Sequence, residues 1–222
     1  MAIQAAKAQT ADYIINNLLV TMGLKVDEAV NQAIAALLHA NSHVVAGVLE
    51  SSVAIQELEL TLDQAVFSAL EKGDLCASEI KRVRSAVNIS KDLSRLGKLA
   101  ANLGRKVTEV GKHQEHEDFS RLQPLAIAVS HLCRQTLRSV TRLDPVLARN
   151  AAEGGASVDA YRDYVLRGLN AQINATDEQS LHLIFASRCL EQIADNAVHL
   201  AENLLVFLAD HREPENSHTM AS

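Results

Sequence analysis

A duplicated pattern of apolar residues constrains this chain more than any other feature. Small and apolar residues near its middle follow the i, i+3, i+4, i+7 spacing of an amphipathic helix, and a matching set recurs 97 residues later. The first set is Leu93, Leu96, Gly97, Ala100 and Leu103, and the second is Leu190, Ile193, Ala194, Ala197 and Leu200. Earlier apolar positions recur at a spacing of 103, namely Val44, Ile55, Leu62 and Val66 with Leu147, Val158, Val165 and Leu169. The pattern therefore predicts two copies of one helical unit, with a shorter connection before the last helix of the second copy.

The residues that make turns are too few for a fold rich in strands. The chain has three prolines and nine glycines in 222 residues, and aromatic residues make up only 3%. We therefore expect an all-α fold, a tandem repeat of two three-helix bundles with six long antiparallel helices. The expected helices cover residues 12–40, 43–72, 75–112, 118–142, 144–172 and 176–210. The expected units are residues 1–114 and 115–212, followed by a flexible tail over 213–222.

Two equivalent sites support these helix boundaries. Asn41–Ser42 and Asp144–Pro145 both suit a helix N-cap followed by the first helical residue. The polar stretch from His113 to Asp118 would join the two units. Its His113 and His116 have the spacing of a pair of metal ligands, but nothing nearby completes a coordination set. We therefore favour a hydrated linker over a metal site.

Charge and cysteine content exclude several classes of protein. The formal net charge is −6, and no dense Lys/Arg run with interleaved aromatics indicates nucleic-acid binding. The N-terminal segment is interrupted by Lys7, Asp12 and Asn16, so it does not resemble a signal peptide, and no uninterrupted apolar stretch suggests a membrane span. The three cysteines lie far apart, which predicts buried thiols in a reducing compartment. We expect a soluble cytoplasmic protein, at most peripheral to a membrane.

The third and sixth expected helices carry a recognisable motif. One reads Asp92-Leu93-Ser94-Arg95-Leu96-Gly97-Lys98, and the other reads Leu190-Glu191-Gln192-Ile193-Ala194-Asp195. Both resemble the Asp-Leu-Glu-Arg-Ile-Gly/Ala-Asp segment of the PhoU family, and the resemblance extends from about Gly23 to Ala209. It implies tandem three-helix bundles.

The resemblance also implies metal binding. Family members bind multinuclear metal clusters with a Glu-x-x-x-Asp motif and an Asp-x-x-x-Asp motif on the preceding helix. In the second unit Glu191 and Asp195 match the first motif, and Asp159 matches one position of the second, whose other position is Gly155. Asp163, one turn later, and His199 are further candidate ligands. The expected metal is iron, zinc, manganese or magnesium, and the alternative is that these residues form a solvated polar face.

The first unit departs further from the motif. Its equivalent positions hold Ser52, Gln56, Ser94 and Lys98, so we expect no metal there. The ammonium group of Lys98 would repel a cation or take its place.

The function implied by the resemblance is regulation without catalysis. Such a protein would act by protein–protein interaction as a negative regulator of a phosphate ABC transporter and of its sensor histidine kinase, and it would be a homodimer. One alternative is a divergent relative that serves another transporter or polyphosphate handling. A second alternative is a carboxylate metal-binding or storage protein of the di-iron type, but the Glu-x-x-His pairs which that chemistry needs are missing.

Overall fold

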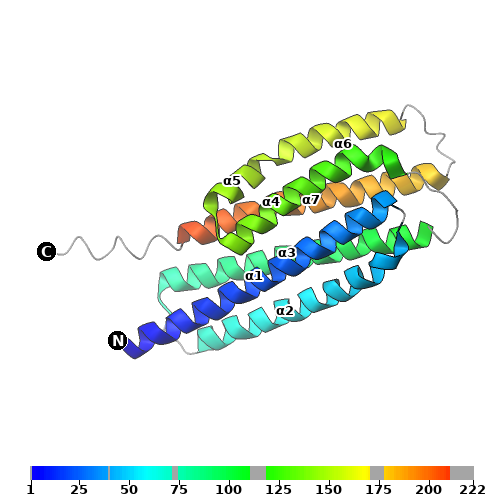
Figure 1. Ribbon diagram of the computed structural model, residues 1–222. Helices are drawn as coiled ribbons and strands as arrows, with labels where there is room; N and C mark the ends of the chain where they lie inside the picture. Colours follow the sequence, from blue (N-terminus) through cyan, green and yellow to red (C-terminus); the bar gives the residue numbers. More distant parts are fainter. Residues whose placement is uncertain (1, 40, 72–74, 111–118, 171–177, 211–222) are drawn as a thin grey trace.

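The computed structural model describes residues 2–39, 41–71, 75–110, 119–170 and 178–210 of the chain (Figure 1). Helices dominate these ranges, which contain no strand, so the predicted all-α class is confirmed. The elements are α1 (Ala2–His39), η1 (Ser42–Val44), α2 (Val45–Glu71), α3 (Ala77–Val110), η2 (Phe119–Leu122), α4 (Gln123–Arg142), α5 (Pro145–Glu153), α6 (Gly155–Asn170) and α7 (Glu178–Asp210). Within the described ranges, no helix combines the length and apolar character needed to cross a bilayer.

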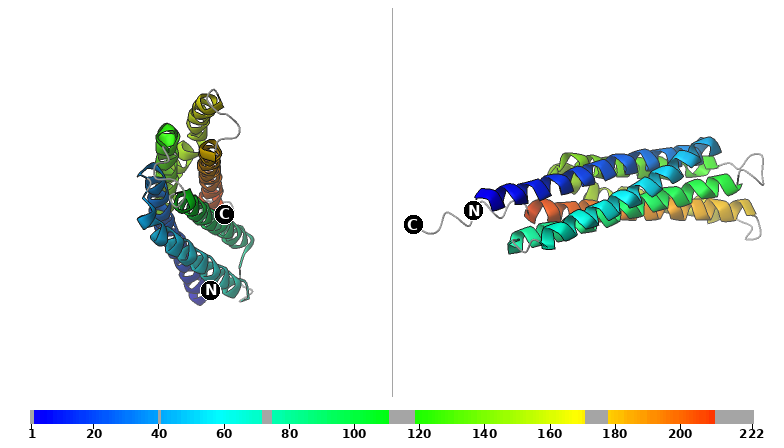
Figure 2. Two further views of the ribbon diagram at one scale, coloured as in Figure 1. Left: turned by 90° about the vertical axis from the view of Figure 1, so that its right-hand side faces the viewer. Right: turned by 90° about the horizontal axis from the view of Figure 1, so that it is seen from below.

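The helices form two bundles that lie side by side. The first bundle contains α1, α2 and α3, and the second contains α4, α5–α6 and α7 (Figures 1 and 2). The seam between them pairs α1 with α4 and α3 with α7, which leaves α2 and α5–α6 at opposite edges of the molecule. The predicted boundary between residues 114 and 115 and the predicted tail over 213–222 lie outside the described residues and stay predictions.

The core explains why the apolar pattern is duplicated. Each repeated position of α3 and α7 is buried, and the five leucines Leu93, Leu96, Leu103, Leu190 and Leu200 are fully inaccessible to solvent. Core side chains from both bundles make one contiguous hydrophobic cluster, built mainly from Leu, Val, Ile and Ala. The buried hydroxyl of Thr136 on α4 also donates across the second bundle to the carbonyl oxygen of Ala197, at 3.2 Å.

The fifth expected helix is interrupted, which the helical pattern did not predict. We expected one helix over 144–172, but α5 ends at Glu153 and α6 begins at Gly155. At the break the Gly154 N–H donates to the carbonyl oxygen of Ala151, three residues back, at 3.1 Å. Adjacent glycines weaken a helix because they lose the most backbone entropy on ordering. The predicted N-cap of this helix is confirmed, since Asp144 accepts hydrogen bonds from the N–H groups of Val146 and Leu147.

The cysteine prediction is correct for two residues and wrong for the third. Cys133 and Cys189 are buried, whereas Cys76 is exposed just before the first residue of α3. There its Sγ lies 3.0 Å from the hydroxyl of Ser78. Burial, with a smaller contribution from the charge of Asp27, raises the pKa of the Cys133 thiol to about 12. The two buried thiols therefore stay protonated at neutral pH.

Candidate acidic site on α6 and α7

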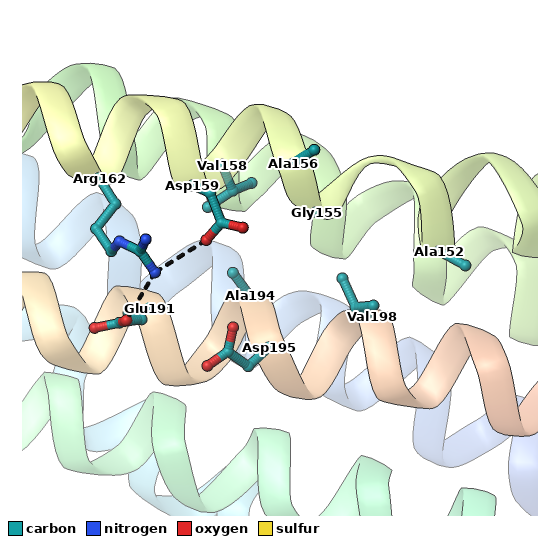
Figure 3. Close-up of a pocket in the computed structure, with 10 residues that line it drawn as sticks. All are labelled: Ala152, Gly155, Ala156, Val158, Asp159, Arg162, Glu191, Ala194, Asp195 and Val198. Carbon is teal, nitrogen blue, oxygen red and sulfur yellow. Dashed lines mark hydrogen bonds and ion pairs between the residues drawn. The ribbon is translucent and has the colours of Figure 1, made fainter.

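Helix periodicity brings the predicted acidic residues of the second bundle together. Glu191 and Asp195 are one turn apart on α7, and Asp159 faces them from α6 (Figure 3). These carboxylates line a cleft of about 340 Å³. The rest of its lining is mostly small or apolar: Ala152, Gly155, Ala156, Val158, Ala194 and Val198. The cleft is narrow because α6 approaches α7 closely at Gly155.

Packing explains why a glycine stands where the motif would have a carboxylate. A Cβ atom added at Gly155 would lie 3.0 Å from Cγ2 of Val198. That distance is tighter than ordinary van der Waals contact, so a larger side chain would require Val198 on α7 to shift. Gly155 therefore allows close packing of the two helices but provides no metal ligand at this position.

Arg162 occupies the space between the carboxylates. Its Nη1 lies 3.0 Å from Asp159 Oδ1 and 3.0 Å from Glu191 Oε1, so one guanidinium group links α6 to α7 (Figure 3). Its Nη2 lies 3.1 Å from Asp163 Oδ1. The hydrogen bond with Asp163 is the largest cause that raises the pKa of Arg162 above its usual value, and Asp159 and Glu191 add to it. Arg162 is thus a permanent positive charge at the centre of the acidic site.

Asp195 is the carboxylate of the cleft that forms no ion pair with Arg162, and its pKa is perturbed. The pKa of Asp195 is raised, first by desolvation and then by the negative charges of Glu191 and Asp159. Arg162 and Arg95 of α3 partly offset this effect. Negative charge therefore remains in excess around the guanidinium group.

The two further candidate ligands lie outside the cleft. Asp163 is exposed and accepts hydrogen bonds from Nε and Nη2 of Arg162, but it does not line the cleft. His199 instead makes contacts across the seam, where its Nδ1 lies 3.1 Å from each carboxylate oxygen of Asp92 on α3. Asn102, the position equivalent to His199 in the first bundle, accepts a hydrogen bond from Arg105 on its own helix. His113 and His116 lie outside the described residues.

Asp92 is the centre of a polar cluster that the sequence analysis missed. The residue is buried, and its carboxylate accepts a hydrogen bond from Nδ2 of Asn203 at 2.6 Å. Its carbonyl oxygen accepts another from Nδ2 of Asn196 at 2.9 Å. The cluster links α3 to α7. The sequence pattern did not predict it, because it depends on which helices of the two bundles lie next to each other.

The motif positions of the first bundle are neutral except for Lys98, which is positive where the second bundle has Asp195. Ser52 and Ser94 are buried, and Gln56 donates to the carbonyl oxygen of Ser52 on its own helix. Lys98 on α3 lies 4.0 Å from Glu59 on α2. Glu59 precedes Arg162 by 103 residues, the spacing of the repeat, so the two positions are equivalent. The cation is therefore Lys98 on α3 in the first bundle and Arg162 on α6 in the second.

These residues do not fit a metal centre as they stand. Among the described residues, no group of three or more His, Cys, Asp or Glu side chains is arranged to hold a metal ion. Asp159 and Glu191 already share the guanidinium group, which a divalent cation would have to displace. Metal binding by Asp159, Glu191 and Asp195 therefore stays a prediction, as does its absence from the first bundle.

The family follows from comparison with known proteins. The PhoU domain matches residues 19–107. The phosphate-specific transport system accessory protein PhoU homolog of Pseudomonas aeruginosa is 27% identical over 194 residues, which cover 86% of this chain and 80% of the relative. The crystal structure of PhoU from the same species has a TM-score of 0.81 and 25% identity, and the match covers 90% of this chain and 98% of that one. The chain therefore contains a PhoU domain and is similar to PhoU proteins along most of its length.

Two further proteins are similar to this chain along most of its length. The PhoU homolog of Zymomonas mobilis is 24% identical over 203 residues, or 90% of this chain and 86% of the relative. A phosphate transport system regulatory protein PhoU from Streptococcus pneumoniae shares the fold, with a TM-score of 0.72 and 17% identity over 92% of this chain and 96% of that one. The predicted resemblance is therefore confirmed. In this chain, however, Asp159 and Glu191 of the acidic motif form ion pairs with Arg162.

Proposed function

We propose that this PhoU-family chain is an accessory regulator of a phosphate-specific transport system. The observation that carries the proposal is the likeness to PhoU accessory proteins along nearly the whole of both chains, rather than over one isolated domain. On this proposal the protein acts in the cytoplasm through protein–protein contacts and catalyses no reaction. It lowers phosphate uptake by the transporter and lowers signalling by the sensor histidine kinase of the same system, and it works as a homodimer.

The molecule has features suited to such a role. Its two bundles share one core, so it presents long, rigid helical faces rather than a deep catalytic cavity. In the cleft on α6 and α7, two of the three lining carboxylates, Asp159 and Glu191, are already bound to Arg162. Rigid exposed helices of this kind serve as docking surfaces at low entropic cost.

The test is deletion of the gene in its own host. We expect phosphate uptake and the output of a phosphate-starvation promoter to rise under phosphate excess, and complementation with the intact gene to restore both. Binding of the purified chain to the transporter's nucleotide-binding subunit and to the cytoplasmic part of the sensor kinase should be measured in parallel. Unchanged uptake and unchanged promoter output after deletion would refute the proposal.

A second candidate function follows from the first bundle. Its motif positions carry Ser94 and Lys98 in place of acidic residues, which favours a divergent role with another transporter or in polyphosphate handling. For that role, deletion would leave phosphate uptake unchanged and alter the polyphosphate content of the cells. The same deletion strain therefore separates the two functions.

A further inference from the structure

The outer face of α2 carries an apolar row that the fold does not bury. The side chains of Val53, Leu60 and Phe67 are 56%, 62% and 61% exposed. They are spaced seven residues apart, so they form one row along the helix. Single exposed apolar residues are common on protein surfaces, but a regular row of large ones is typical of a helix that packs against a partner.

Acidic side chains alternate with this row. Glu50, three residues before Val53, and Glu57, three residues before Leu60, are exposed, and the whole of α2 contains five acidic residues and no Lys, Arg or His. Among the residues that the structure describes, neither of these two carboxylates forms an ion pair. The face is therefore both apolar and negatively charged.

The scaffold does not require this face, as the second bundle shows. The positions of α5–α6 equivalent to Val53 and Leu60 hold Ala156 and Asp163. The position equivalent to Phe67 holds Asn170. The edge helix of the second bundle thus folds without an apolar row, so the row on α2 needs an explanation other than the stability of a three-helix bundle.

The position of α2 leaves its outer face accessible. The helix packs against α1 and α3 and lies along one edge of the molecule, with the second bundle at the opposite edge (Figures 1 and 2). A partner helix could lie along it without displacing any described element.

We propose that the outer face of α2 binds a basic amphipathic helix of a partner protein. The partner helix would place apolar residues against Val53, Leu60 and Phe67, and Lys or Arg against Glu50 and Glu57. A second α2 helix fits less well, because its own carboxylates would face those of the first and α2 has no basic residue to pair with them. The anionic surface of a membrane would be repelled by the same carboxylates. This proposal rests on one part of the proposed function, namely that the chain has a protein partner.

The experiment uses the full-length chain and two designed peptides of about the length of α2. The first is a fluorescein-labelled helix with Leu at every seventh position flanked by Lys, and the second has Glu in place of each Lys. Fluorescence anisotropy should show saturable binding of the basic peptide, weakened at high salt, and no binding of the acidic peptide. The double variant Leu60→Ser/Phe67→Ser should lose affinity at least about tenfold, and Glu50→Gln/Glu57→Gln should show a smaller dependence on salt.

A matched control comes from α7, where Leu181 and Val206 are exposed by 58% and 54%. Leu181→Ser/Val206→Ser should bind the basic peptide as the unmodified chain does. Circular dichroism and urea unfolding should be unchanged in every variant, since all the altered side chains are exposed. These measurements need no transporter or kinase, so a failed peptide assay leaves the deletion phenotype as a separate test of function.

Three results would overturn the proposal. One is that the Leu60→Ser/Phe67→Ser variant binds the basic peptide as tightly as the unmodified chain does. Another is self-association of the unmodified chain, measured by sedimentation, that this double variant abolishes, because the face would then bind a second copy. The last is binding to vesicles of anionic phospholipid that the double variant abolishes, because the face would then bind a membrane.

Discussion

Replacing Arg162 with Ala tests whether an internal cation occupies the acidic site. The substitution removes three ion pairs, with Asp159, Asp163 and Glu191, at distances of 3.0 to 3.1 Å. Partly exposed pairs of this kind contribute roughly 0.2–1 kcal/mol each, so we expect a loss of about 1–2 kcal/mol in the free energy of unfolding without divalent ions. The four carboxylates left behind would repel one another, and a divalent cation would relieve that repulsion.

The assay is urea unfolding and isothermal titration calorimetry of the variant with manganese or zinc, against the same measurements in EDTA. We expect the Arg162→Ala variant to bind the ion at least about tenfold more tightly than the unmodified chain, equivalent to about 1.4 kcal/mol. Bound ion should also restore the lost stability. Adding Glu191→Ala and Asp195→Ala should abolish the gain.

Two matched controls limit the interpretation. Arg167 is exposed on the same helix and donates to the backbone oxygen of Asp163, so Arg167→Ala removes a charge and leaves the acidic site intact. Lys98→Ala removes the cation of the first bundle, which pairs with Glu59. Neither variant should gain affinity for a divalent ion. Equal affinity in the Arg162→Ala variant and the unmodified chain would refute the reasoning, because the guanidinium group would then not compete for the site.

The remaining predictions concern pH, packing and thiol chemistry. The pKa of Asp195 is raised in the folded state, so its charged form destabilises the fold and stability falls as pH rises through that pKa. Asp195→Asn should therefore raise the free energy of unfolding at pH 7, by less than about 1 kcal/mol because the side chain is exposed. Near pH 3 the substitution should have no such effect. An equal effect at both pH values would contradict this prediction. Ala100 and Ala197 are completely buried. Ala100→Leu or Ala197→Leu should therefore each lower the free energy of unfolding by about 1–3 kcal/mol through overpacking. A urea midpoint within error of that of the unmodified chain would show that the core can expand around the larger side chain. Ellman's reagent should label one thiol per native chain, that of Cys76, and a Cys76→Ser variant that still reacts would show that the buried cysteines open.

The helical fold was predictable because its signal is local and repeated. Burial of Leu93 and Leu190 follows from a periodicity that each helix carries within its own sequence, and the spacing of 97 residues relates the two bundles. The cap at Asp144 was predictable for the same reason, since a capping side chain bonds to backbone groups two and three residues away. The break at Gly154 was visible as a Gly-Gly pair, but the apolar pattern continued past it and suggested one helix.

The acidic site was only half predictable. Sequence spacing placed Glu191 and Asp195 on one face of a helix. The resemblance to the family motif, rather than spacing, identified Asp159 on the preceding helix. Neither placed the guanidinium group of Arg162 between them, because the distance from Arg162 to Glu191 depends on how closely α6 approaches α7. That approach depends in turn on the contact between Gly155 and Val198, which belong to different helices.

The sequence alone determined which residues are helical, which of their faces are buried and which family the chain resembles, because these depend on residues a few positions apart and on a repeat that can be counted. The tertiary structure alone decided that Arg162 neutralises the motif carboxylates, that Asp92 joins α3 to α7 and that the row on α2 stays uncovered. Each of these depends on the separation of helices that are far apart in the chain. Side-chain packing sets that separation, and an amphipathic pattern specifies which face of a helix packs but not which helix it meets.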